Sequence, residues 1–333
     1  MSVHVSMEWT YRGMQTIIVE NELIRVVCIP ELGGKIWQIT YKSRGKDLLW
    51  QHPRLKPRPA AIHSSYDDQF YGGWDELFPC DIAEIINEET MPDHGELWSL
   101  PWEFEVNHNP QEVIVRLWVE TPISVCRMEK CITLRSGESK LRFHHKLTNM
   151  GHKELPFLWK LHTAMKVDEY SRIDAGAKEV YIEDFGTPRN GQTKISYEWP
   201  FAPDREGNLH DMRTCMSQTS AIDEFQYMTQ MHEGWCSLTD TRSGVGLGLV
   251  FDRAVFRSCW LFAAYGGWRN LNTVVLEPCT GYPVSVQEGI QAGTHRTLAV
   301  GECLETEVIA SIYSGFRAIS SINREGEVFG DNV

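Results

Sequence analysis

Short runs of alternating apolar residues recur along the whole chain, and this pattern constrains the fold more than any other feature. In residues 112–120, one side of the run carries Val113, Val115, Leu117 and Val119. A period of two places successive side chains on opposite faces of a β-strand. Turn residues separate these runs, as is typical of sandwiches and barrels. The sequence therefore predicts an all-β fold of large antiparallel sheets.

The organisation of the chain favours one unit. No linker rich in Pro, Gly or Ser divides the 333 residues, so we predict a single domain over residues 1–333. Two short helices are expected, over residues 67–77 and 222–231. The least regular stretch, residues 186–216, is expected to be a long loop.

Composition excludes several classes of protein. The formal net charge of −13 argues against nucleic acid as a partner, because phosphates require a basic surface. No segment approaches the roughly 20 apolar residues of a membrane helix, and the first residues lack the features of a signal peptide. We therefore expect a cytoplasmic protein away from the membrane, a monomer or homodimer, with its nine cysteines as free thiols.

Three segments are hard to explain as plain structure. The first, MPDHGELWSLPWE, has His94 before a glycine and among tryptophans. The second, LPFLWKLHTAMKV, is an apolar strand with Lys160 and His162 on one face. The third, NTVVLEPCTGYP, ends a buried run in Glu277, a carboxylate that is costly to bury unless it is paired or used.

Structural interpretations of the same residues stay open. His162 can be a buried structural histidine, and His94 can cap a turn. Glu277 can form a buried ion pair with Lys160 or Arg269. No His, Cys, Asp or Glu set has the spacing of a metal site, and no phosphate-binding glycine loop or nucleophile elbow is present. We expect no metal and no cofactor.

At these residues the sequence resembles the galactose mutarotase-like superfamily, which includes the aldose 1-epimerases. LIRVVCIPELGGKIWQITYKSRGKDLLW is similar to the family's opening strands, and PDHGELW to the segment with the first active-site histidine. FLWKLHTAM resembles the strand of the second histidine, and VVLEPCTGYP the strand of the catalytic glutamate. LAVGECLETEVIASIY resembles the closing hairpin, with Val300 in place of a proline.

The resemblance implies a β-supersandwich fold and cofactor-free interconversion of sugar anomers. The sequence also departs from the family pattern at two places. GGWDELFP stands where the family has an arginine segment. The asparagine usual before the second histidine is absent, and Leu158, Trp159 and Lys160 stand there. These departures concern which sugar is bound more than the chemistry.

The mechanism predicted for this family pattern needs one base and one acid. Glu277 is the expected base on the C1 hydroxyl, since a carboxylate with a pKa near ~4.3 is ionised at neutral pH. His162 is the expected acid on the ring oxygen, with neighbouring carboxylates holding its proton. His94 is expected to steady that oxygen by a hydrogen bond.

Substrate binding is expected to use aromatic and charged side chains. Trp74 and Trp268, each after a Gly-Gly pair, are predicted to stack on the sugar unless they are core residues. Asp75 is predicted to accept hydrogen bonds from sugar hydroxyls. Lys160 is predicted to reach the site beside His162.

The identity of the sugar is left open. Arg54, Lys56 and Arg58 form a basic cluster that could attract an anionic sugar. Alternatively, Lys160 pairs with an acid and the basic loop is merely solvated.

Two rival functions remain. One is a glycosidase that pairs Glu277 with Asp75 or Glu76. The other is a non-catalytic sugar-binding protein on the same fold.

Overall fold

The computed structural model describes residues 2–333, and β-strands dominate them. The chain divides into two compact units. Unit 1 is Met1–His162 with Thr280–Val308, and unit 2 is Thr163–Cys279 with Ile309–Val333. The division falls inside two strands, β16 (Lys160–Met165) and β28 (Cys303–Tyr313). The expectation of a single domain stays a prediction.

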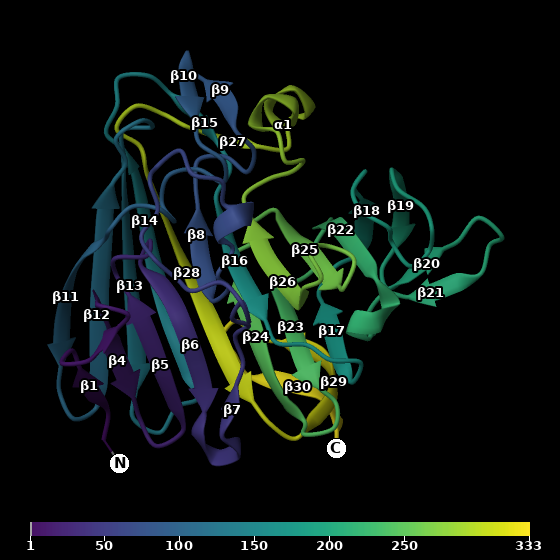
Figure 1. Cartoon of the computed structure of the whole chain (residues 1–333), viewed down its shortest axis with the longest axis horizontal. Helices are drawn as coiled ribbons and strands as arrows, with labels where there is room; N and C mark the ends of the chain where they lie inside the picture. The colour runs from purple at the N-terminus through teal and green to yellow at the C-terminus, as the bar shows by residue number, and fades with distance from the viewer. Residues whose placement is uncertain (1) are drawn as a thin grey trace. The chain divides into compact units, whose positions relative to one another are not determined.

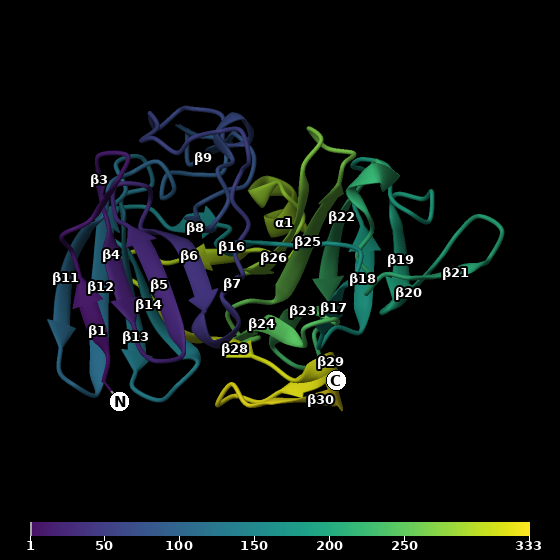
Figure 2. The same ribbon diagram turned by 60° about the horizontal axis from the view of Figure 1, so that its bottom comes forward.

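Unit 1 contains two large sheets, and Figure 1 and Figure 2 both show them layered face to face. The first pairs, in order, β1 (His4–Ser6), β4 (Ile17–Glu20), β5 (Ile24–Ile29), β6 (Lys35–Tyr41), β8 (Trp74–Leu77) and β16, with β7 (Lys46–Asp47) beside β6. The second pairs, in order, β11 (Glu103–His108), β12 (Glu112–Glu120), β13 (Cys126–Arg135), β14 (Lys140–Asn149) and β28.

The alternation in β12 forms the core between these sheets. Its four predicted apolar residues are all buried, and the residues between them are more exposed. Trp74 of β8 meets Phe143 of β14, with ring centroids 4.7 Å apart. The prediction of an all-β fold with period-two strands is confirmed.

Unit 2 is also built from antiparallel strands. One set pairs, in order, β26 (Asn272–Cys279), β25 (Ser258–Tyr265), β22 (Ile222–Thr229), β18 (Glu179–Ile182) and β19 (Ile195–Glu198). Another pairs β24 (Val245–Phe251), β23 (Trp235–Asp240) and β17 (Ser171–Ala175). A hairpin of β29 (Phe316–Ile322) and β30 (Val328–Asn332) closes an apolar cluster with β23 and β24.

The remaining strands form short two-stranded pairs outside the large sheets. They are β2 (Thr10–Tyr11) with β3 (Met14–Gln15), β9 (Glu84–Ile86) with β10 (Glu89–Met91), β15 (Leu155–Phe157) with β27 (Arg296–Leu298), and β20 (Phe201–Pro203) with β21 (Leu209–Asp211). The stretch 186–216, expected to be a loop, therefore holds three short strands, β19, β20 and β21.

Both predicted helices are wrong. Residues 67–77 begin with a single 3-10 turn, Asp67–Gln69, and then Gly72 and Gly73 take φ of +83° and +80°, which ends any helix before β8. Residues 222–229 form strand β22 because β18 and β25 pair with it on both sides. The α-helix of the described residues, α1 (Val286–Ala292), was not predicted.

The start of α1 carries a local sequence signal, although the helix is too short to show helical periodicity. Ser285 accepts a hydrogen bond from the backbone N–H of Glu288, which is the Ser-x-x-Glu pattern of a helix N-terminus. Elsewhere, all nine cysteines are free thiols, as expected. Across residues 2–333, no helix has the length and apolar character needed to cross a membrane.

Candidate functional site

Both histidines that the sequence singled out lie against one tyrosine of unit 1. The Tyr66 hydroxyl is 3.1 Å from Nδ1 of His162, and it donates a hydrogen bond to Oδ2 of Asp75 at 2.7 Å. The Tyr66 ring stacks on the His94 ring, with centroids 4.4 Å apart. The structure thus gathers His94, His162 and Asp75 around Tyr66, and sequence reasoning did not identify Tyr66.

Three separate segments position this cluster. Asp75 comes from β8 and His162 from β16, which are neighbouring strands of one sheet. His94 lies in a tight turn with φ of +57°, followed by Gly95 at +72°. A Cβ atom on Gly95 would come within 2.0 Å of the carbonyl oxygen of Phe78, so only glycine fits and the turn direction is fixed.

A buried ion pair supports Asp75. The Lys35 ammonium lies 2.5 Å from Asp75 Oδ2 and donates a second hydrogen bond to the Gly72 carbonyl. Burial lowers the pKa of Lys35, and the Asp75 carboxylate opposes that effect. Asp75 Oδ1 is buried and accepts no hydrogen bond from residues 2–333. An unsatisfied buried acceptor calls for a water or ligand donor, which fits the predicted role of Asp75 toward sugar hydroxyls.

His94 lies between two carboxylates. Its Nδ1 is 2.7 Å from Asp93 Oδ1 and its Nε2 is 3.6 Å from Asp81 Oδ1. Burial alone would lower the pKa of His94, but Asp81 and the hydrogen bond to Asp93 outweigh it and raise the pKa. Lys160 also forms an ion pair with Asp81, so the alternative that Lys160 pairs with an acid is the one observed.

His162 has the opposite environment. Burial lowers its pKa well below the ordinary value, and the positive charges of Lys160, His94 and Lys35 lower it further. The expectation that carboxylates keep His162 protonated is therefore wrong, because its charged neighbours are mainly cations. His94 therefore keeps its proton to a higher pH than His162 does.

This difference predicts the order in which the two histidines titrate. We expect the His94 imidazole to lose its proton above the ordinary histidine pKa of about 6.5, and His162 to become protonated only well below it. Imidazole ¹⁵N NMR against pH measures both, with His94→Gln and His162→Gln for assignment. A higher midpoint for His162 than for His94 would contradict the arrangement.

Glu277 lies in unit 2, on β26, and is 1% exposed. It faces Trp260 across the β25–β26 pair, and Trp260 in turn faces Tyr227 of β22. Phe225 is two residues from Tyr227 on β22, and Phe262 is two residues from Trp260 on β25. The two phenylalanines pair with each other, lie on the same face of the sheet and are partly exposed. The Trp260 and Tyr227 rings are 4.9 Å apart. A buried carboxylate thus ends a row of aromatic rings in which Trp260 and Tyr227 are fully buried, and only Phe225 and Phe262 offer partly exposed rings on which a sugar could stack.

The two tryptophans predicted to bind sugar differ. Trp74 is 0% exposed and packs on Phe143 inside unit 1, so its predicted role in stacking is wrong. Trp268 lies in the β25–β26 turn, half-buried, with its edge against Phe262 and the Arg269 guanidinium 4.9 Å from its ring centre. Its position beside the aromatic row is compatible with its predicted role, which stays a prediction.

Glu76 faces away from Asp75 and is part of the core. It is bonded to His145 at 3.0 Å and to Nε1 of Trp159 at 2.8 Å, with the Lys130 ammonium 3.5 Å away. These partners lower its pKa against the effect of burial, which raises it. Glu76 is therefore a structural carboxylate and a poor candidate for the second acid of a glycosidase.

In the part of the chain that the structure describes, no group of three or more His, Cys, Asp or Glu side chains is arranged to hold a metal ion. The cluster around Tyr66 instead offers hydrogen-bond donors and acceptors. Cofactor-free chemistry stays a prediction.

Comparison with solved structures defines the class of fold. The chain is similar to a galactose mutarotase-like protein from Clostridium acetobutylicum, with a TM-score of 0.68, 13% identity, and coverage of 94% of this chain and 99% of that one. It is similar to a protein from Klebsiella pneumoniae provisionally named an aldose 1-epimerase, with a TM-score of 0.68, 14% identity, and coverage of 93% and 83%. The fold is the galactose mutarotase-like β-sandwich, as the sequence resemblance implied.

Two further comparisons add no activity. The Slr1438 protein from Synechocystis sp. PCC 6803 matches with a TM-score of 0.66 and 16% identity, over 93% of this chain and 99% of that one. Residues 5–83 match a family described as a domain of unknown function, DUF5107. That segment includes Tyr66 and Asp75.

Proposed function

We propose that this protein is a mutarotase of the aldose 1-epimerase type, which interconverts the α and β anomers of a free sugar without a cofactor. The observation that carries the proposal is the cluster around Tyr66, where the partly buried His94 has a raised pKa and the buried His162 a lowered one. Paired groups whose environments separate their pKa values are typical of acid–base sites.

The reaction opens the sugar ring. A base removes the proton of the C1 hydroxyl, the C1–O5 bond breaks as C1 becomes an aldehyde, and an acid protonates the ring oxygen. Rotation about C1–C2 and reclosure give the other anomer and return both protons. We assign the base to Glu277, as the family resemblance implies, and the acid to His94, because its carboxylate neighbours raise its pKa above the ordinary histidine value. Because the Tyr66 hydroxyl donates to Asp75, Nδ1 of neutral His162 donates to Tyr66, and its Nε2 is the nitrogen that accepts a hydrogen bond from a sugar hydroxyl.

This assignment exchanges the roles of the two histidines relative to the sequence prediction. It also gives a direction to the pH dependence. Because the pKa of His94 is raised, the acid form persists above the ordinary histidine range, and turnover falls as pH rises through that pKa. Asp75, Lys160 and Trp268 are assigned to sugar binding, and Trp74 is not.

Replacing Tyr66 with Phe tests the hydroxyl that contacts both Asp75 and His162. The ring that stacks on His94 is kept, but the hydroxyl between Asp75 and His162 is lost, so we expect turnover to fall by about ten- to a hundredfold with the fold intact. Polarimetry of freshly dissolved α-sugar measures the rate. Tyr170→Phe is the matched control, since it removes the same group from an exposed tyrosine of unit 2. Equal rates for Tyr66→Phe and the wild type would remove Tyr66 from the mechanism.

Two other functions give different results in the same assays. A non-catalytic sugar-binding protein would bind aldoses and leave their rate of mutarotation unchanged. A glycosidase would release the leaving group from aryl glycosides, for which Glu277 would need a second carboxylate. Asp75 already bonds to Lys35 and Tyr66, and Glu76 is in the core, so the arrangement favours mutarotation over hydrolysis.

A further inference from the structure

A concave surface lies in unit 1 beside the segment that carries Phe70. It is a cavity of about 450 Å³, within the size range of small-molecule sites. Its wall combines the β2–β3 hairpin, the loop of residues 54–59 and the segment of residues 68–71. The Phe70 ring contacts His162, with centroids 5.4 Å apart, while the next residue, Tyr71, lines the cavity.

The charge of this cavity is opposite to that of the protein. Arg12, Arg54, Lys56 and Arg58 line it, and its lining includes one acid, Asp68, although the whole chain carries a net charge of −13. Among residues 2–333, no carboxylate forms an ion pair with Arg12, Lys56 or Arg58. A concentration of unneutralised cations in a concave surface attracts anions.

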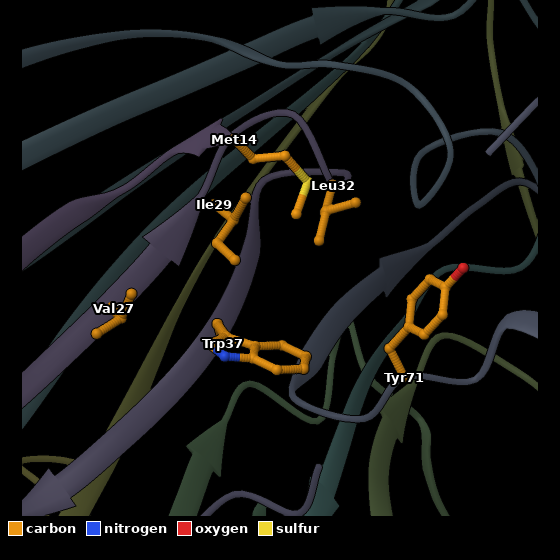
Figure 3. Packing of buried hydrophobic residues seen from close by; sticks show 6 residues of the cluster. All are labelled: Met14, Val27, Ile29, Leu32, Trp37 and Tyr71. Carbon is orange, nitrogen blue, oxygen red and sulfur yellow. The ribbon is translucent and has the colours of Figure 1, made fainter. Parts of the chain in front are cut away.

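The segments that carry the basic residues are held in place by packing and by backbone restraints. Met14 and Tyr71 line the cavity and also belong to a buried apolar cluster that includes Trp37, and Figure 3 shows their side chains in this cluster. Arg12 is held in a left-handed conformation, φ +57°, at the turn of its hairpin. Pro57 and Pro59 restrict the loop that carries the other cations. The basic residues are thus attached to backbone segments that packing and proline hold in place, and apolar side chains lie between them in the cavity wall.

We propose that this cavity binds a small anionic carbohydrate bearing a phosphate monoester, with Arg12, Lys56 and Arg58 as the phosphate donors. Arginine pairs with phosphate through two parallel hydrogen bonds, and lysine adds a point charge. Met14 and Tyr71 offer apolar contacts to the carbon skeleton of the ligand. A bare phosphate ion has no carbon skeleton and would leave these two side chains without a contact. The carbohydrate part of this assignment rests on the proposed function, whereas the anion part rests on the cavity alone.

Titration calorimetry tests this assignment with glucose 6-phosphate, glucose and inorganic phosphate as probes. At low salt we expect glucose 6-phosphate to bind at least about tenfold more tightly than either glucose or phosphate, an advantage that shrinks at high salt. The double variant Lys56→Gln/Arg58→Gln should remove most of that advantage. The control Arg317→Gln/Arg324→Gln changes the net charge equally at exposed residues of unit 2 and should bind as the wild type does.

Three results would overturn the proposal. They are equal affinity for glucose and glucose 6-phosphate, equal losses in the variant and its control, and phosphate binding as tightly as glucose 6-phosphate. Calorimetry measures binding without turnover, so the two proposals fail separately. Tight, variant-sensitive binding without mutarotation would leave the cavity assignment standing and remove the proposed activity. Mutarotation without a preference for the phosphorylated sugar would leave the proposed activity standing and remove the cavity assignment.

Discussion

Replacing Glu277 with Gln should lower the rate of anomer interconversion by about two to four orders of magnitude, the usual effect of removing a positioned acid or base. The amide has nearly the shape of the carboxylate but cannot take a proton from the C1 hydroxyl. Because Glu277 is buried on β26 between neighbouring strands, a substitution of equal size should preserve the fold and sugar binding. Exchange NMR on the sugar measures the rate, and calorimetry measures the affinity.

The control for this variant is Glu206→Gln, the same chemical change at an exposed turn of unit 2. It should leave the rate unchanged. If Glu277→Gln retains the wild-type rate on a sugar that the protein converts, Glu277 is not the base and the mechanism must be reassigned.

Replacing Trp74 with Ala should destabilise the protein by about 3–5 kcal/mol, as expected for truncating a fully buried large aromatic side chain. The indole packs on Phe143 between the two sheets of unit 1, and its loss leaves a cavity that the sheets cannot close. Urea denaturation measures the change in the free energy of unfolding.

Trp268→Ala provides the comparison, because this side chain is half-buried in a turn. Its removal should lower the free energy of unfolding by about 1 kcal/mol or less. Its sugar affinity should fall if the ring stacks on substrate. A Trp74→Ala protein of wild-type stability with weakened sugar binding would show that Trp74 belongs to the binding surface after all.

The strands could be predicted from sequence because their signal is local. Alternation in residues such as Val113 and Val115 depends only on which face each side chain takes. The same rule failed for residues 222–231, where Phe225 and Tyr227 alternate over too short a run to distinguish a strand from a helix. That error hid the aromatic row, since both residues share a face with Trp260 only when the segment is a strand.

The chemistry of the site was less predictable. His94 and His162 stood out through their neighbours in sequence, but no local pattern marks Tyr66, whose partners come from three separate segments. The position of the proton could not be predicted for the same reason. It depends on burial and on Asp81, which lies near His94 and Lys160 only in the folded chain.

The most direct test of the central claim is exchange NMR on a panel of aldoses at anomeric equilibrium, with and without the protein. We expect that the protein speeds α/β exchange of at least one aldose, that chelation does not reduce this rate, and that Glu277→Gln abolishes nearly all of it. Binding of the aldoses with exchange rates equal to those in buffer alone would contradict the account.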